Sequence, residues 1–306
     1  MEKVSRRNFV KTAAIAGAAA AGAALVGCSS NSSASASTST SAAAAKPVVL
    51  VVSFGTSYND SRHLTIGAIE DAIREKFYPD YEVRRAFTAQ IIIDKLKQRD
   101  GITIDNVEDA LDRLISDGVT DIIVQPTHLM DGYEYNDLKD TLGQYSDKFK
   151  SVKLGDPLLT SDDDYERVAK AVYAAMQKYD DGATALCLMG HGTEAASNSD
   201  YAKMQDVFKN LGYNQVFVAT VEAEPTFEDV INAARDAGYQ KAVLRPLMVV
   251  AGDHANNDMA DEEDPESFAA MFKAAGFQVT SVIEGLGQLL DIEEIYVEHA
   301  GAAKAL

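Results

Sequence analysis

Short apolar runs alternate with helical patterns over most of the chain. The run "PVVLVVSF" (47–54) predicts a buried strand, and residues 59–77 after it have the apolar spacing of a helix. "YEVRRAF" (81–87) predicts a strand, "VEDALDRLISDG" (107–118) an amphipathic helix, and "TDIIVQP" (120–126) a buried strand. This alternation predicts βαβ units and a parallel sheet, which is the α/β class.

The second part of the sequence repeats motifs of the first. The matched segments are "VVSFGTSYNDS" (51–61) with "CLMGHGTEAAS" (187–197), and "GVTDIIVQPTHLMDGYEYND" (118–137) with "GYQKAVLRPLMVVAGDHANN" (238–257). Two matches in the same order predict two pseudo-symmetric α/β halves, 47–155 and 156–306, each a parallel sheet flanked by helices. Ligands of such sheets bind beyond the carboxyl ends of the strands, so we expect the matched segments to line a cleft between the halves.

The repeat also shows where the two halves differ. His191 occupies the place of Phe54, and His254 occupies the place of Glu134. The second half therefore carries two histidines at predicted strand ends, where the first half has neither.

Two imidazoles at adjacent strand ends suit a borderline divalent metal such as cobalt, nickel, zinc or ferrous iron. A carboxylate would complete a three-ligand site, and the candidates are Glu194, Glu222, Glu224 and Asp253. Glu222 is favoured because "VFVATVEAEP" (216–225) predicts a strand ending there, before a helix that Pro225 opens. The alternative is a carboxylate that only favours the positive end of that helix.

Three histidines lie elsewhere in the predicted elements. His63 and His299 are expected at the surface, whereas His128 follows a strand-ending proline and is a weaker candidate for the cleft. Cys187 lies in the apolar run "ATALCLM", which predicts a buried structural thiol.

The first 46 residues have the composition of a targeting segment. "SRRNFVK" has the form of a twin-arginine export signal, and "LVGC" reads as a lipobox ending at Cys28. We therefore expect a signal over 1–27, a lipid anchor on Cys28 and a Ser/Ala linker over 28–46. The protein would be exported and held at the outer face of the cytoplasmic membrane or in the periplasm, with the lipid as its membrane contact.

Charge and motifs exclude several function classes. The formal charge is −19, with 25% charged and 46% hydrophobic residues, which argues against binding nucleic acid. The sequence has no phosphate-binding loop, no dinucleotide fingerprint and no Gly-x-Ser-x-Gly elbow, so neither a nucleotide cofactor nor serine-hydrolase chemistry is predicted.

Six ordered motifs carry a resemblance to a known family. They are "VSFGTSYNDSR", "RRAFTAQII", "PTHLMDGYEY", "MGHGTEAASNSDY", "TVEAEP" and "PLMVVAGDHANNDMA". Together they resemble the anaerobic cobalt chelatases that act on sirohydrochlorin, which are class II tetrapyrrole chelatases related in fold to ferrochelatase. The resemblance covers about 47–298.

The resemblance implies a tetrapyrrole in the cleft and an ATP-independent insertion of a divalent metal, Co²⁺ or alternatively Fe²⁺ or Ni²⁺. It places the family's metal-binding histidines on His191 and His254, and its site glutamate on Glu222. One departure is Ala195, where the family usually has a second histidine.

A tetrapyrrole with eight carboxylates would need cations and packing surfaces in the cleft. We expect it to meet strand-end and arginine residues of the first half, namely Phe54, Gly55, Thr56, Tyr58, Arg62, Arg85 and Glu134. The backbone N–H groups at Gly55 and Gly192 would approach its carboxylates or its ring. Arg245 is a weaker candidate. The alternatives are surface ion pairs for the arginines and a core position for Phe54.

Two other function classes stay open at this point. One is an exported lipoprotein that binds a tetrapyrrole or a metal in the same cleft without turnover, which the export signal and Ala195 favour. The other is a metallo-hydrolase using the same three residues. The sequence leaves both a monomer and a homo-oligomer open.

Overall fold

The computed structural model describes residues 45–306. The predicted export signal, the Cys28 anchor and nearly all of the Ser/Ala linker lie outside the described residues. Among the helices from residue 45 onward, none combines the length and the apolar character needed to cross a membrane.

The first half is built on a sheet in the order β2-β1-β3-β4-β9. Its strands are β1 (Val48–Ser53), β2 (Glu82–Phe87), β3 (Asp121–Pro126), β4 (Ser151–Leu154) and β9 (Lys304–Ala305). The first four are parallel, and β9 pairs antiparallel with β4. Its helices are α1 (Asn59–Arg62), α2 (Ala68–Phe77), α3 (Gln90–Asp100), α4 (Val107–Ser116) and α5 (Tyr133–Tyr145).

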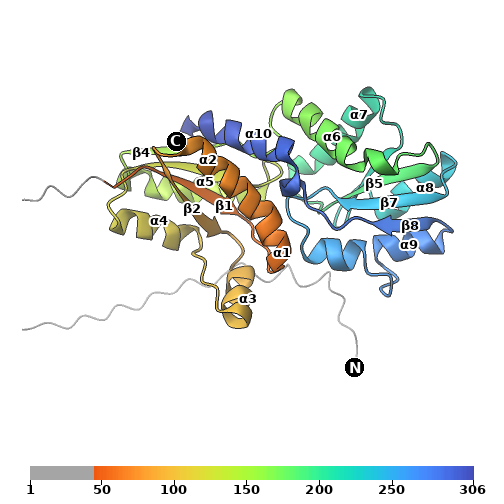
Figure 1. Cartoon of the computed structure of the whole chain (residues 1–306), viewed down its shortest axis with the longest axis horizontal. Coiled ribbons are helices and arrows are strands. Elements are labelled where there is room, and N and C mark those ends of the chain that lie inside the picture. Colours follow the sequence, from red (N-terminus) through yellow and green to blue (C-terminus); the bar gives the residue numbers. More distant parts are fainter. Residues whose placement is uncertain (1–44) are drawn as a thin grey trace, which may run out of the picture. The chain divides into compact units, whose positions relative to one another are not determined.

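The second half is built on an all-parallel sheet in the order β6-β5-β7-β8. Its strands are β5 (Thr184–Gly190), β6 (Val216–Thr220), β7 (Lys241–Pro246) and β8 (Gln278–Ser281). The remaining helices are α6 (Asp162–Met176), α7 (Ser199–Asn210), α8 (Phe227–Asp236), α9 (Phe268–Ala274) and α10 (Leu290–Gly301). The two parallel sheets, each with helices on its faces, confirm the predicted α/β fold class (Figure 1).

Continuous apolar strands are explained by burial on both faces of each sheet. In β1, Val49 and Val51 belong to one core cluster, whereas Leu50 and Val52 belong to another that α4 and α5 cover. In β5, Leu188 lies in the first cluster and its neighbours face α8 and α9. Cys187 is one of those neighbours and is fully buried, as predicted; burial raises the pKa of its thiol.

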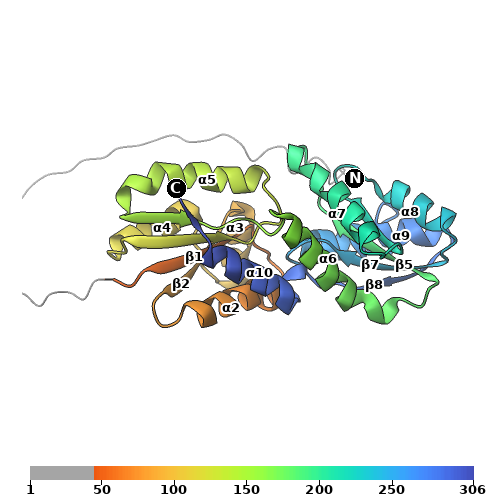
Figure 2. The ribbon, with the colours of Figure 1, turned by 90° about the horizontal axis from the view of Figure 1, so that it is seen from above.

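One core cluster is shared by the two halves. It joins residues of β1 and α2 to residues of β5, α6, α7 and α10. The last helix, α10, packs against α2 of the first half and against α6, and β9 after it extends the first sheet (Figure 2). The sequence prediction did not foresee this return of the C-terminal segment to the first sheet.

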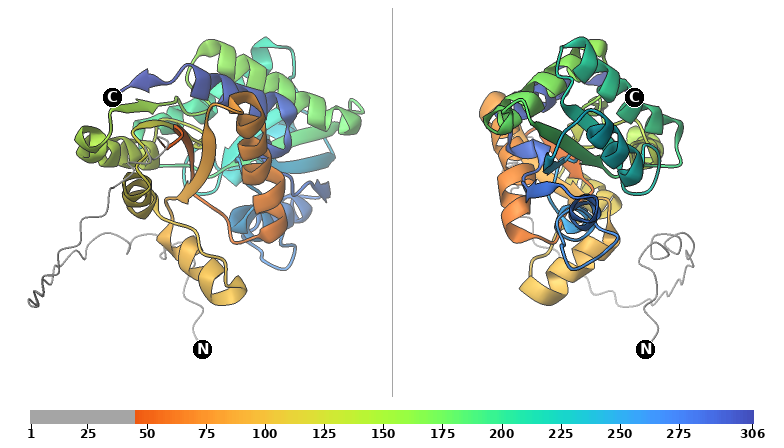
Figure 3. Two further views of the ribbon diagram at one scale, coloured as in Figure 1. Left: turned by 60° about the vertical axis from the view of Figure 1, so that its left-hand side comes forward. Right: turned by 90° about the vertical axis from the view of Figure 1, so that its right-hand side faces the viewer.

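Helix α3 has a separate small core. Figure 3 shows α3 standing away from the first sheet, and its buried Ile93 and Leu96 pack with Phe87 at the end of β2. The helix ends at Gly101, which adopts the left-handed conformation that a C-terminal cap requires.

The predicted repeat is present in the backbone. Gly55 and Gly192, which the repeat matches, both have positive φ, +101° and +86°. The side chain of Asn136 donates to the Gly132 carbonyl at 2.9 Å, and Asn256 donates in the same way to Gly252 at 2.7 Å. The two halves therefore use the same turn after the third strand of each.

Candidate metal and tetrapyrrole site

The candidate metal ligands follow three adjacent strands of the second sheet. His191 follows the last residue of β5, Glu222 lies two residues beyond β6, and His254 lies in the loop after β7. The ladder between β5 and β6 continues past the strands, because the Glu222 N–H donates to the His191 carbonyl at 2.9 Å. The order of strands in the sheet thus brings together residues 63 positions apart.

The two imidazole rings face each other edge to face. Their centroids are 4.5 Å apart, and their planes are at 87°. Nδ1 of His191 is 2.8 Å from the Gly192 carbonyl, and Nδ1 of His254 is 2.8 Å from a carboxylate oxygen of Asp258. With each Nδ1 holding a proton for these acceptors, Nε2 is the lone-pair nitrogen of each ring, which is the usual arrangement of metal-binding histidines.

Glu222 lies beside this pair on the side of His191 Nδ1. One carboxylate oxygen is 3.9 Å from that nitrogen, and the side chain is 36% exposed. Within residues 45–306, no three His, Cys, Asp or Glu side chains are grouped closely enough to hold a metal ion as they stand. The structure places the three candidate ligands near one another without arranging them as a metal-binding group.

Asp258 is the main site residue that the sequence analysis missed. It lies on the π-helical turn Ala255–Met259, one turn after His254, and both side chains are about one-third exposed. Burial opposes protonation of His254, but the hydrogen bond and charge of Asp258, with the charges of Glu222 and Asp253, outweigh it and raise the His254 pKa. The signal was the four-residue spacing of the two residues, which aligns side chains on one helical turn.

Of the predicted substrate-binding residues after β1, one is exposed and two contact the second half. Phe54 is 49% exposed, so the alternative core position is wrong, and its ring is available to pack on a ligand. Thr56 is buried at 3% exposure, with its hydroxyl close to Gly252 of the second half. Tyr58 also reaches the second half, where its hydroxyl is 3.5 Å from an Asp253 carboxylate oxygen.

The strand-end glycines are required by packing. A Cβ on Gly55 would lie 2.6 Å from the Phe87 ring, and a Cβ on Gly192 would lie 2.8 Å from the Ala223 nitrogen. The Gly192 N–H donates to the buried Tyr201 hydroxyl at 3.3 Å. The expectation that this N–H faces a ligand is therefore wrong, because its partner belongs to the protein.

Glu134, the counterpart of His254, lies on the first half's side of the site. It is exposed in the first turn of α5, and a carboxylate oxygen is 3.9 Å from where a Cβ on Gly132 would sit. The hydroxyl of Ser197, from the second half, is 3.5 Å from that same position. Glu134 thus lies where the two halves meet.

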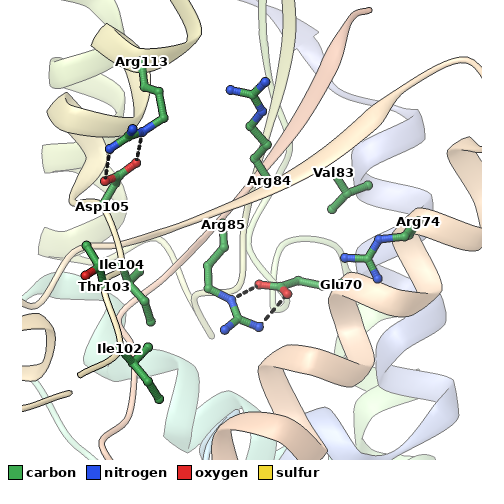
Figure 4. A pocket seen from close by; sticks show the side chains of 10 residues that line it. All are labelled: Glu70, Arg74, Val83, Arg84, Arg85, Ile102, Thr103, Ile104, Asp105 and Arg113. Atoms are coloured by element: carbon green, nitrogen blue, oxygen red, sulfur yellow. Dashed lines mark hydrogen bonds and ion pairs between the residues drawn. The ribbon is translucent and has the colours of Figure 1, made fainter. Parts of the chain in front are cut away.

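Arg85 lines a hollow of about 450 Å³ along the outer edge of β2 (Figure 4). It forms a bidentate ion pair with the buried Glu70, at 2.6 and 2.7 Å. The other arginines of the hollow also have carboxylate partners: Arg74 with Asp71, Arg84 with Glu82 and Asp117, and Arg113 with Asp105. The ion-pair alternative therefore describes Arg85 in this structure.

Arg245 does not face the cleft, and that expectation is wrong. It is fully buried on β7, with one guanidinium nitrogen 3.3 Å from a Glu284 carboxylate oxygen. Burial lowers its pKa, although Glu284 opposes this effect. Arg62 instead lies on α1, where it donates to the Asn59 side chain at 2.8 Å.

The remaining histidines differ in burial. His63 is exposed as predicted, whereas His299 is not a surface residue: its side chain is 13% exposed and lies 3.3 Å from Asp164. Both ring nitrogens of His128 are buried without a hydrogen-bond partner, and burial lowers its pKa to about 4. Neither ring nitrogen of His128 is therefore exposed to a cleft in this structure.

The prediction for Pro225 is also wrong. Helix α8 begins at Phe227, after a capping box in which Thr226 and Asp229 exchange hydrogen bonds. Because Glu222 lies five residues before Phe227, it is not a residue of the helix's first turn. The alternative reading of Glu222 as a carboxylate at a helix start loses its support.

Comparison with known proteins identifies the family. A family model described as cobalt chelatase (CbiK) matches residues 47–304. The chain belongs to the CbiK cobalt chelatase family. A sirohydrochlorin cobaltochelatase of Salmonella typhimurium is 37% identical over 254 residues, which cover 83% of this chain and 95% of that protein.

A second relative agrees with this family membership, and a solved structure agrees with it in fold. The sirohydrochlorin cobaltochelatase CbiKC of Nitratidesulfovibrio vulgaris is 30% identical over 260 residues, 84% of this chain and 90% of that protein. The structure of SirB from Bacillus subtilis with Fe³⁺ superposes with a TM-score of 0.59 at 16% identity, over 83% of this chain and 94% of that one. At that identity the match supports the chelatase fold alone.

Proposed function

We propose that this protein inserts divalent cobalt into sirohydrochlorin without ATP. The observation that carries the proposal is the pair of facing imidazoles, His191 and His254, whose Nδ1 atoms are both engaged by protein acceptors. Together with membership of the cobalt chelatase family, this pair favours a site that binds a divalent metal as a substrate.

Insertion exchanges two pyrrole protons for one metal ion. His191 and His254 would hold Co²⁺ through Nε2 and replace part of its hydration shell. Glu222, 3.9 Å from His191, is placed to take up a pyrrole proton or to act as the third ligand. Its exposure of 36% would let it release that proton to solvent and then accept the second one, so that the metal would pass to the four ring nitrogens with both protons transferred to water.

The macrocycle would lie between the strand ends of the two halves. The exposed rings of Phe54 and Tyr133 offer apolar surface there, and the binding energy of such contacts can bend a macrocycle toward the geometry that accepts a metal. Glu134 takes the place of a histidine on this side, which makes the proposed site asymmetric: the candidate metal ligands lie on one half, and the positions of the other half that match His191 and His254 are Phe54 and Glu134.

The test uses purified protein with sirohydrochlorin and Co²⁺ under anaerobic conditions. Conversion of the absorption spectrum to that of the cobalt product, faster than in buffer, is the expected result. Tight binding of a finished tetrapyrrole without any conversion would contradict chelatase activity and favour a binding protein.

The choice of metal is part of the proposal. Imidazole ligands accept Co²⁺, Ni²⁺ and Fe²⁺, so the ligand types alone do not select among them. We expect Co²⁺ to be inserted fastest, in keeping with the family, and Fe²⁺ and Ni²⁺ more slowly. Parallel assays with each metal at equal free concentration measure this order.

We also propose that the protein is exported and lipid-anchored through Cys28. The support is the order of "SRRNFVK", "LVGC" and the Ser/Ala linker in the sequence. Incorporation of labelled palmitate in wild-type cells, with none in a Cys28→Ala variant, is the expected result, and protease should digest the protein in intact spheroplasts. Protection from protease would contradict export.

A further inference from the structure

The loop that carries His254 is held by the opposite half of the molecule. The N–H of Ala251 donates to the Ser61 hydroxyl at 3.0 Å, and Ala251 is buried at 4% exposure. Ser61 lies on α1 of the first half, 190 residues away in the sequence. A buried backbone N–H needs a partner, so this hydrogen bond contributes to fixing where the loop runs.

The next two residues of the loop also contact the first half. The Thr56 hydroxyl is 3.1 Å from where a Cβ on Gly252 would sit, which is a tight contact. The Tyr58 hydroxyl lies 3.5 Å from Asp253. We call residues 56–61 the anchoring segment, because three of its side chains meet three consecutive residues just before His254.

The anchoring segment rests on a continuous helix. The hydroxyl of Thr65, on the π-helical turn after α1, donates to the Ser61 carbonyl, and Thr65 is fully buried. Thr65 also lies close to the second half, since Cβ atoms on Gly285 and Gly287 would lie 3.0 Å from it. This side of the junction between the halves is therefore tightly packed.

His254 lies in a helical turn, and the second half also holds the chain before it: the N–H groups of Leu286 and Gly287 donate to the Met248 and Val249 carbonyls, at 2.9 and 3.0 Å. His254 is the residue before the π-helical turn Ala255–Met259, and no side chain caps that turn. The ring is oriented by Asp258, and the backbone next to it is held by the Asn256–Gly252 bonds and, from the opposite half, by the anchoring segment.

We propose that the anchoring segment positions the metal ligand His254 from the opposite half, with Ser61 as the main positioning residue. The inference rests on the proposed role of His254 as a metal ligand. Loss of the Ser61 hydroxyl leaves the Ala251 N–H unpaired, and the loop relaxes away from the His191 ring. Because residues that orient a metal ligand without touching the metal can change metal affinity by about 10- to 100-fold, we expect the hydroxyl to influence metal affinity.

The test measures Co²⁺ binding to the full chain without tetrapyrrole, by calorimetry and by the d–d absorption bands of the bound ion. Ser61→Ala should weaken binding by about 10-fold or more and shift the bands. Ser61→Thr, which keeps the hydroxyl, should stay close to wild type. Ser146→Ala is the matched control, because the Ser146 hydroxyl bonds only its own turn, at the Gly143 carbonyl.

Wild-type affinity and an unshifted spectrum in Ser61→Ala would overturn the proposal, even if that variant unfolds at a lower temperature. If Ser61→Ala does not fold, Tyr58→Phe provides the test, because it removes one hydroxyl from a partly exposed side chain. Weaker Co²⁺ binding supports the anchoring segment, and unchanged binding contradicts it. His254→Ala sets the affinity expected when the ligand itself is lost.

The outcome is separable from that of the proposed function. Cobalt binding that depends on Ser61, in a protein that never converts sirohydrochlorin, would refute the chelatase activity and keep the positioning role. Conversion of sirohydrochlorin, with Co²⁺ affinity unchanged in Ser61→Ala, would support the chelatase activity and refute the positioning role.

Discussion

His191 and His254 obtain their ligand geometry from acceptors that never touch a metal. A backbone carbonyl orients one ring and the Asp258 carboxylate orients the other, each at 2.8 Å. The motif "GHG" places the first acceptor next to its histidine, whereas the second depends on a helical turn formed after His254. Single residues outside the ligand set therefore decide which ring nitrogen of each histidine is free to bind a metal.

Replacement of Asp258 tests this orientation. Asp258→Ala should weaken Co²⁺ binding by roughly 10- to 100-fold, because the His254 ring loses the partner that fixes its tautomer. Competition against a metal-sensitive dye measures the change. Glu262→Gln, which removes a nearby carboxylate paired with Lys273, is the control and should bind like wild type. Equal affinities in the two variants would contradict the role of Asp258.

The burial of His128 leads to a prediction about how folding stability depends on pH. Its pKa is lowered to about 4 by burial, from an ordinary value of 6.5. The unfolded chain therefore binds a proton between about pH 6.5 and pH 4 that the folded chain rejects, so stability falls as the pH falls through this window. The total effect is on the order of 3 kcal/mol.

Urea unfolding at pH 7 and at about pH 4.5 checks this dependence. The His128→Leu variant should lose less stability than wild type between the two pH values, because its side chain does not titrate. The exposed His63→Gln variant should keep the wild-type dependence. An identical loss in His128→Leu and wild type would show that His128 is not the group responsible.

The strand-end turns are the elements that place the site. Gly192 combines a positive φ with contact to the Ala223 backbone, and the residue before it is His191. The turn thus determines where β5 stops and where its histidine is presented to Glu222. Apolar periodicity could predict the strand, but the need for glycine depends on a neighbouring loop that is distant in sequence.

Gly192→Ala and Gly182→Ala separate backbone strain from steric contact. Both glycines have positive φ, but a Cβ on Gly182 has no neighbour within 4 Å. Gly182→Ala should cost about 1 kcal/mol in free energy of unfolding, and Gly192→Ala clearly more, together with weaker Co²⁺ binding. Urea unfolding of the two variants measures the difference, and equal costs would contradict the steric part.

At the scale of the whole molecule, the sequence predicted the two α/β halves because burial on both faces produces continuous apolar strands. It also predicted that His191, Glu222 and His254 would meet, because adjacent parallel strands end at one edge. It could not predict that Arg245 is buried or that Arg85 pairs with Glu70, since ion pairs depend on side-chain packing across elements. The return of α10 and β9 to the first sheet was missed for the same reason: no local pattern encodes the partner.

The contact between the halves is the part of the fold that affects the proposed site most directly. The shared core, the anchoring segment and α10 join the first half to the half that carries the metal ligands. A site formed this way depends on both halves being folded and in contact. If the protein is a chelatase, the tetrapyrrole and the metal should therefore meet between the two halves.

The most direct test is the initial rate of Co²⁺ insertion into sirohydrochlorin by wild type, His191→Ala and His254→Ala, followed by absorbance under anaerobic conditions. If His191 and His254 hold the metal for insertion, the wild-type rate should lie well above that in buffer, and both variants should have rates near the buffer value, with folding intact by circular dichroism. A wild-type rate equal to that in buffer, or variants as fast as wild type, would contradict this prediction.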